Sequence, residues 1–354
     1  MHLSLHPISC YLLVLLVHAA VAGSTPETEE LFRIPYSDDN LHIYVLPMGE
    51  GESTVIQCPG GDIVIVDMGS MRGGWTGDRV HTFLQHQLEN VRTVIVSNTS
   101  PEHYNYIAGV IGTAALGLEK VIVGGRREFY ESDLDFTAWL DTHEKKVRFL
   151  NEGEPCITDC DVTSIQCGSP AKGAELNVLG ANLAQNHSNS GIILQLVSQE
   201  FKLLLPGDFA GHDIEELVIY EWNLLGSSLA SSHFKLARHG SADGTNGESF
   251  LLAISPSYAF ASNAYPDDYD EWDPNCDIVW RLLNLQCIKK SKYISSFACG
   301  SANRGSPIRY NNWPYEIHST AVDQQLGKLI RINVNLTEPL NASTAPQLYY
   351  IPLE

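Results

Sequence analysis

The sequence has few basic residues for its length. Its 354 residues include 22 Lys and Arg against 42 Asp and Glu, which gives a formal net charge of −20 at pH 7. Because proteins hold nucleic acid mainly through clustered Lys and Arg, this balance excludes tight nucleic-acid binding. It is compatible with metal cations and with cationic, mineral or matrix partners, and also with an acidic charge that serves solubility alone.

Long apolar runs are absent after the first 22 residues, so the sequence predicts no transmembrane anchor. Residues 11–22 are apolar and end in Ala20, Val21 and Ala22, the small-x-small pattern that signal peptidase accepts. The run is short for a membrane span of roughly 20 residues, which favours a cleaved signal over an anchor. We therefore expect a signal peptide over residues 1–22, a polar leader over 23–40 and a secreted, extracellular protein.

Several catalytic motifs are also missing. The sequence contains no Gly-x-Ser-x-Gly elbow, no phosphate-binding Walker loop and no dinucleotide fingerprint. It has no internal repeat, no low-complexity run and no Pro- or Ser-rich linker. These absences predict one domain over residues 41–300, and a C-terminal extension over residues 301–354 that packs on the domain or trails from it.

The cysteines fit an oxidising compartment. Cys10 lies in the signal peptide, and the other seven cysteines allow three disulfides with one thiol left over. Cys58 follows strand-like residues, and we expect it to be the odd thiol. The six candidates for disulfides are Cys156, Cys160, Cys167, Cys276, Cys287 and Cys299. A metal site at Cys156 and Cys160 is the weaker alternative, because no second close pair of Cys or His completes a zinc set.

Four Asn-x-Ser/Thr sequons are typical of a secreted glycoprotein. They lie at Asn98, Asn186, Asn335 and Asn341. Asn98 has two interpretations: a glycan at that position, or an unused triplet at a tightly packed strand end close to Pro101.

The hydrophobic pattern alternates between strand-like and helix-like segments. Strand-like runs lie at residues 41–46, 54–57, 63–67, 94–96, 121–123, 176–179, 191–196, 201–205, 234–236, 258–260 and 330–334. Helical spacing occurs at residues 78–90, 106–116, 212–221, 248–253 and 277–285. Strands joined both by tight turns and by helices predict an α/β (α+β) fold, with a mixed sheet covered by helices. Residues 264–276 predict a surface loop, with loose calcium binding as the weaker alternative.

Four ordered blocks carry a family resemblance. They read LPMGEGESTVI…GGDIVIVDMG (residues 46–69), VIVSNTSPEHYNY (94–106), NSGIIL…LLLPGD (189–208) and FKLARHGS (234–241). They are similar to the motifs "DVGQGD…ILIDAG", "TH-x-H-x-D-H", "N-S-L-V…LLTGD" and "LKVPHHGS" of the metallo-β-lactamase superfamily, in its ComEC-like branch. The resemblance implies a four-layer αββα sandwich of two mixed sheets.

The resemblance also implies a centre in which His and carboxylate side chains hold two divalent metals. Asn98 and Ser100 stand at the two His positions of the first metal, so that site is degenerate. Asp67 matches the family's structural aspartate.

The second metal position retains more of the family's ligand residues. Its implied ligands are Glu102, in place of an Asp, with His103, Asp208 and His239. Asp208 is also the catalytic candidate. Arg238 stands where the family has a further His, and we expect it to enter the vacated pocket and pair with Asp208 and Glu102. The implied cofactor is one divalent metal, Zn or Mn, or none if the centre has lapsed.

Two functions follow. The first is a secreted glycoprotein of degenerate fold that is non-catalytic or weakly active, with an extracellular matrix role as one hypothesis. The alternative is a mononuclear metal-dependent hydrolase of phosphodiester or ester substrates. The first depends on the lost ligands, the acidity, the sequons and the cysteines, and the second on the four retained ligand positions.

Overall fold

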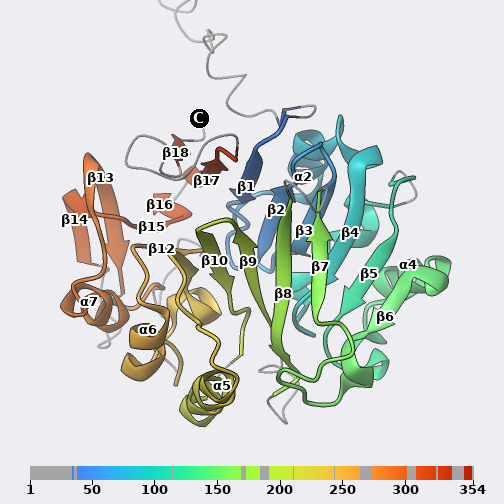
Figure 1. The fold of residues 1–354 in the computed structure, drawn as a ribbon. Coiled ribbons are helices and arrows are strands. Elements are labelled where there is room, and N and C mark those ends of the chain that lie inside the picture. The colour runs from blue at the N-terminus through green and yellow to red at the C-terminus, as the bar shows by residue number, and fades with distance from the viewer. Residues whose placement is uncertain are drawn as a thin grey trace, which may run out of the picture. The chain divides into compact units, whose positions relative to one another are not determined.

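The strands form two large sheets that face each other, as Figure 1 shows. The computed structural model describes residues 34–35, 38–112, 115–168, 173–183, 191–209, 211–242, 244–263, 273–300, 308–323, 326–336 and 347–352. Residues 264–272 of the loop predicted over 264–276, and the sequons at Asn186 and Asn341, lie outside these ranges.

The first sheet has nine strands in the order β16-β17-β1-β2-β3-β4-β5-β6, with β18 paired to β17. The strands are β1 (Leu41–Val45), β2 (Ser53–Gln57), β3 (Ile63–Met68), β4 (Val91–Val96), β5 (Lys120–Val123), β6 (Val147–Phe149), β16 (Ala321–Asp323), β17 (Leu326–Val334) and β18 (Gln347–Pro352). β1, β2 and β3 are antiparallel neighbours, whereas β3 to β6 run parallel. The sheet is therefore mixed.

The second sheet has seven strands in the order β15-β12-β11-β10-β9-β8-β7. They are β7 (Ser164–Cys167), β8 (Ala174–Ala181), β9 (Ile192–Ser198), β10 (Phe201–Leu205), β11 (His233–Lys235), β12 (Tyr258–Ala261) and β15 (Ile317–Ser319). β7 to β10 are antiparallel, and β10, β11, β12 and β15 are parallel. This confirms the predicted α/β class with two mixed sheets.

Apolar side chains fill the space between the sheets and also the outer layers. One buried cluster joins β1–β5 and β17 to β7–β10, and a second joins the other face of β8–β12 to helices. The helices are α2 (Gly77–Leu84), α3 (Ile107–Val110), α4 (Leu134–Thr142), α5 (His212–Leu224), α6 (Glu248–Ile254) and α7 (Cys276–Asn284). Short 3-10 helices are η1 (Leu88–Asn90), η2 (Pro101–His103), η3 (Arg127–Tyr130), η4 (Glu144–Lys146), η5 (Leu150–Gly153) and η7 (Ala237–Gly240). No helix among the described residues is long and apolar enough to cross a bilayer.

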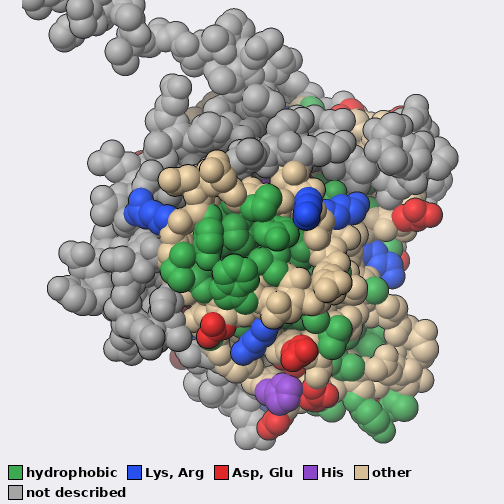
Figure 2. All heavy atoms as spheres, turned by 90° about the vertical axis from the view of Figure 1, so that its left-hand side faces the viewer, with side chains coloured by type: hydrophobic (Ala, Val, Ile, Leu, Met, Phe, Trp, Pro, Cys, Tyr) green, Lys and Arg blue, Asp and Glu red, His purple; other side chains and the backbone are tan. Residues whose placement is uncertain are grey.

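A hairpin of β13 (Lys290–Cys299) and β14 (Ile308–Tyr315) packs beside α7. Its inner face buries Phe297 and Trp313, whose rings stack 4.5 Å apart. Trp280 and Ile308 stay 44% and 43% exposed, and Figure 2 shows apolar side chains gathered on the face that carries α7 and this hairpin. Trp280 of α7 and Ile308 of β14 are thus large apolar side chains that remain exposed to solvent.

The disulfides correct the prediction for the odd thiol. Cys58 is bonded to Cys167, and further bonds join Cys156 to Cys160 and Cys276 to Cys299. The free cysteine is Cys287, so the pairing expected for it was wrong. Cys58 follows β2 and Cys167 ends β7, which belong to different sheets, so the two sulfurs meet only when the sheets pack together.

Candidate metal centre

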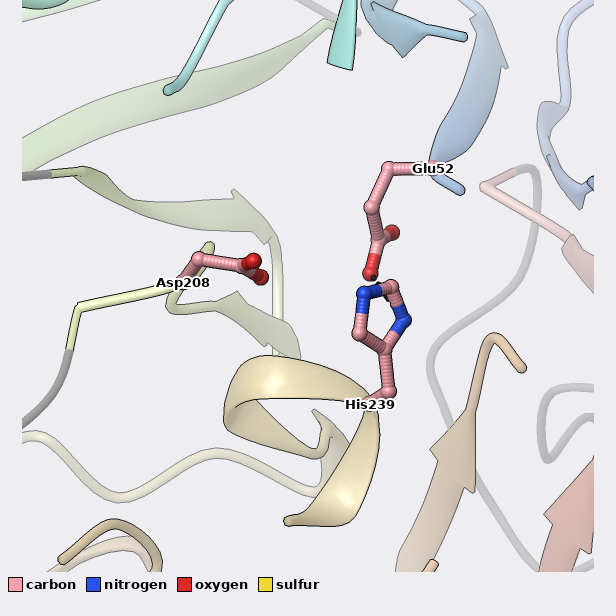
Figure 3. Close-up of side chains that lie close together, drawn as sticks. All are labelled: Glu52, Asp208 and His239. Atoms are coloured by element: carbon pink, nitrogen blue, oxygen red, sulfur yellow. Dashed lines mark ion pairs between the residues drawn. The ribbon is translucent and has the colours of Figure 1, made fainter. Parts of the chain in front are cut away.

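The candidate ligands lie on loops at one edge of the two sheets. η2 follows β4, Asp208 follows β10 and η7 follows β11, so each stands at the carboxyl end of a parallel strand. Figure 3 shows Glu52, Asp208 and His239 pointing toward one another from three separate segments. The fold thus brings together residues that lie far apart in the sequence.

Asp67 organises the floor of this centre. Its carboxylate accepts hydrogen bonds from the backbone N–H and the hydroxyl of Ser97, both at 2.6 Å. Its Oδ2 also lies 3.0 Å from Nδ1 of His103. A Cβ on Gly69 would lie 2.6 Å from the backbone of Glu102, so the Asp-x-Gly pattern lets η2 approach closely. Asp67 therefore has the structural role that its motif implies.

His103 is fully buried between two carboxylates. Its Nδ1 faces Asp67, and its Nε2 lies 3.2 Å from Oδ2 of Asp208. Burial alone lowers the pKa of His103, but the charges of Asp208 and Asp67 outweigh it and hold the pKa well above the ordinary value.

The pKa of the Asp208 carboxyl moves in the opposite direction. Burial raises this pKa, but the neighbouring His103, together with His239 and Lys235, outweighs that effect and holds the pKa well below the ordinary value. Asp208 is therefore ionised at neutral pH, as a metal ligand requires.

The described residues offer two groups of cation ligands that share Asp208. One group is Glu102, His103 and Asp208; the other is Glu52, Asp208 and His239; within each, the ligand atoms lie within 4.8 Å of one another. The buried atom Asp208 Oδ1 makes no hydrogen bond, whereas Glu52 Oε1 pairs with the ammonium of Lys235 and His103 Nε2 lies 3.2 Å from Oδ2 of Asp208. Because buried polar atoms are normally hydrogen-bonded, the unpartnered Oδ1 of Asp208, the residue that both groups share, fits a cation beside it.

The cation that pairs with a buried acid here is Lys235, which corrects the expectation for Arg238. The ammonium of Lys235 forms an ion pair with Glu52, and both side chains are buried. No ion pair joins Arg238 to Asp208 or Glu102, all three of which the structure describes. Arg238 and His239 have backbone φ values of 46° and 57°, a turn that the sequence pattern does not reveal.

Sequence reasoning missed Glu52 and Lys235, although both stand in the matched blocks. Phe234 and Leu236 pack in the outer core, so Lys235 between them points toward the facing sheet. A lysine flanked by apolar residues in a buried strand was the sequence signal that could have identified Lys235.

His239 contacts Glu52 and Ser262. Its Nδ1 lies 3.3 Å from Oε1 of Glu52 and 2.6 Å from the carbonyl oxygen of Ser262.

Asn98 is fixed by hydrogen bonds to the backbone of Ser100 and to Tyr130. The side-chain Oδ1 of Asn98 accepts a hydrogen bond from the backbone N–H of Ser100 at 2.9 Å. Asn98 is 0% exposed, and its carbonyl oxygen accepts from the Tyr130 hydroxyl at 3.3 Å. Asn98 therefore lies inside the fold and not at the rim of the centre.

Burial of Asn98 predicts that its sequon stays unmodified in the folded protein. A glycan needs a solvent-facing amide nitrogen, whereas Asn335 is exposed and should carry one. Glycopeptide mass spectrometry of protein secreted from eukaryotic cells measures both positions. A glycan found at Asn98 would contradict the prediction.

Hydrogen bonds from the Asn246 side chain hold the turn that carries His239. The side-chain amide of Asn246 binds both the N–H and the C=O of Ala237, each at 3.1 Å. Next to it, the N–H of Gly247 donates to Oε2 of Glu215 at 2.9 Å. Burial raises the pKa of Glu215 from 4.5 to about 7, although the hydrogen bond from Gly247 works against it.

Glu215 predicts a pH-dependent stability. Between pH 4.5 and 7 the folded state keeps a proton that the unfolded state releases, so the free energy of unfolding falls as pH rises through this window. Glu215→Gln should remove that dependence and stabilise the protein at pH 8 by up to about 3 kcal/mol. Urea unfolding at pH 4.5, 6 and 8 measures it, with the exposed Glu216→Gln as control. Parallel pH profiles for wild type and Glu215→Gln would refute the prediction.

A cavity of about 10 Å³, room for about one water molecule, lies beside the centre. It is lined by Glu52, Thr54, Val66, Asp67, Ser97, Ile192, Leu205, Gly207 and Lys235. The cavity therefore places a polar space next to the Lys235–Glu52 pair.

No protein-family model matches the chain. No curated protein matches it in sequence. Among solved structures, it is similar to the metallo-β-lactamase fold protein YhfI from Bacillus subtilis (9% identity, TM-score 0.42, 76% of this chain and 100% of that one). It is also similar to the short form of human tRNase Z (11%, 0.38, 63% and 92%) and to CmlA, a diiron β-hydroxylase from Streptomyces venezuelae (11%, 0.38, 73% and 49%). These likenesses concern the fold and do not single out the ComEC-like branch.

Proposed function

We propose that this protein is a secreted glycoprotein of the metallo-β-lactamase superfamily, in its ComEC-like branch, that binds one divalent cation and has lost two-metal hydrolysis. The ligands are Glu102, His103 and Asp208. The observation that carries the proposal is that Asp208 Oδ1 is buried without a hydrogen-bond partner and belongs to one ligand group with His103 and Glu102.

The surroundings of His103 support a metal-ligand role. Asp67 faces Nδ1, which is the arrangement that orients a metal-binding imidazole so that Nε2 points to the ion. One imidazole with two carboxylates suits Zn²⁺ or Mn²⁺.

Loss of the other metal position accounts for a single cation. Asn98 is buried and its Oδ1 is bonded to the Ser100 N–H, so neither side chain offers an imidazole there. A neutral amide and a hydroxyl are weak ligands for zinc.

Three disulfides among the described residues are compatible with an extracellular protein, as is the apolar N-terminal stretch of the sequence. A matrix role is the finer proposal, and the net charge of −20 supports contact with cationic or mineral partners. Fractionation of secreting tissue tests it: recovery only from soluble fluid would contradict a matrix role.

Metal analysis of the purified secreted protein tests the cation site. We expect about one equivalent of metal in the wild type and in a control with the exposed His86→Ala, and loss of metal in His103→Ala. Since His103 is buried, the half-buried Glu102→Gln serves as a second variant, with weaker binding expected. A wild type that contains no metal and shows no rise in melting temperature with Zn²⁺ or Mn²⁺ would refute the site.

A mononuclear hydrolase of phosphodiesters or esters is the second candidate, because Asp208 belongs to both ligand groups. A bound divalent ion would supply an activated water there. Turnover of a bis-aryl phosphodiester by the metal-loaded wild type, lost in Asp208→Asn, would support it. Equal turnover in the two proteins would exclude it.

A further inference from the structure

Lys235 places an amino group inside the protein. Its side chain is 4% exposed and pairs with Glu52, which is 3% exposed. Taking an ammonium out of water is costly unless it is paired, so a lysine in this position needs the acid that faces it.

That same acid belongs to the second ligand group. Glu52, Asp208 and His239 come from the segment before β2, the loop after β10 and the turn after β11, and Figure 3 shows their side chains converging. Asp208 Oδ1 has no hydrogen-bond partner, and one ligand atom from each of the three residues lies within 4.8 Å of the other two. Two carboxylates and an imidazole at this spacing form a ligand set for a divalent ion.

We infer that Glu52, Asp208 and His239 form a second divalent-cation site, which the ammonium of Lys235 closes by taking the place of the ion. The inference rests on the proposed function only through Asp208, the ligand that both groups share. Lys235 is thus a positioning residue that keeps an ion out of the site formed by Glu52, Asp208 and His239.

The charges of the buried side chains give the physical reason. Glu52, Asp67 and Asp208 are buried acids, and each buried carboxylate needs a nearby cation. The ion pair with Lys235 meets this need for Glu52 without a metal. The remaining N–H groups of Lys235 border the water-sized cavity lined by Ser97 and Thr54, where a water can accept from them.

Lys235→Met tests the inference, because Met keeps much of the length and apolar volume of the side chain but not its charge. The matched control is the double variant Glu52→Gln/Lys235→Met, which lacks both charges. The readouts are bound Mn²⁺ or Zn²⁺ after equilibrium dialysis, and the melting temperature with and without the ion.

We expect Lys235→Met to bind one more ion than the wild type, and to show a larger rise in melting temperature on adding the ion. The double variant should return to the wild-type number. An unchanged ion count in Lys235→Met would overturn the inference and leave the proposed function standing. A wild type without metal, beside a Lys235→Met protein with one ion, would support the inference and refute the proposed function.

The folding of Lys235→Met, with and without the ion, also tests the inference. If Lys235→Met folds only when Mn²⁺ or Zn²⁺ is present, the ion has replaced the ammonium, which supports the second site. If it fails to fold with the ion, whereas the double variant folds, Lys235 serves only as the partner of Glu52 and the inference is wrong.

Discussion

Replacing both Cys58 and Cys167 by Ser is expected to lower the free energy of unfolding by about 5 kcal/mol. The two cysteines lie 109 residues apart, and the bond joins the end of β2 in one sheet to the end of β7 in the other. Cross-linking a loop of roughly 100 residues removes about 4.7 kcal/mol of chain entropy from the unfolded state. Urea unfolding followed by tryptophan fluorescence and by circular dichroism measures the loss.

Two other replacements act as controls. Cys156 and Cys160 are only 4 residues apart, and the same relation gives about 2 kcal/mol for their bond. Cys287→Ser breaks no bond and should change stability by less than about 0.5 kcal/mol. Equal losses for the long and the short loop would show that chain entropy does not set the stabilisation.

Asp67→Ala is the second large effect, with an expected loss of about 3–5 kcal/mol. The change removes the carboxylate that accepts from the N–H and the hydroxyl of Ser97, and it removes one of the two carboxylates that flank His103. Asp67→Asn keeps one acceptor oxygen and should lose less. Urea unfolding of the metal-free proteins at one pH compares the variants.

Asp141→Ala is the matched control for Asp67. Asp141 is exposed and pairs with Arg127 at the surface, where an ion pair contributes less than about 1 kcal/mol. If Asp67→Ala cost no more than Asp141→Ala, Asp67 would not organise the centre.

Much of the fold could be predicted because its central strands are apolar on both faces. All six residues of β3 are buried, and helical spacing predicted α5, α6 and α7 near their observed bounds, whereas α2 ends at Leu84 and not at residue 90 as predicted. The predicted helix over residues 106–116 is helical as α3 only at Ile107–Val110, and residues 113–114 are not described.

Other elements had no clear pattern. α4 is short, and its buried residues Phe136, Trp139 and Leu140 stand among acidic neighbours. Five of the eight residues of the hairpin strand β14 are exposed, and its pairing with β13 shifts register twice. Such segments are fixed by contacts with the rest of the molecule, which periodicity does not encode.

The sequence could predict which residues gather at the centre, but not how they pair. The order of the blocks places Glu102, His103, Asp208 and His239 together, and the structure brings them into two ligand groups. The choice between Arg238 and Lys235 depends on left-handed backbone angles after β11, and the pairing of Cys58 depends on how two sheets meet. Both are properties of the packed fold.

The nine-stranded sheet also sets an order of events during synthesis. β1 lies between β2 and β17, and all five of its residues are buried. Until residues 326–334 leave the ribosome, one edge of β1 has no partner, and an open apolar edge invites pairing with other chains. The first sheet therefore cannot be completed around β1 until almost the whole chain has been synthesised. A nascent chain that stalls before residue 326 would be a client for chaperones.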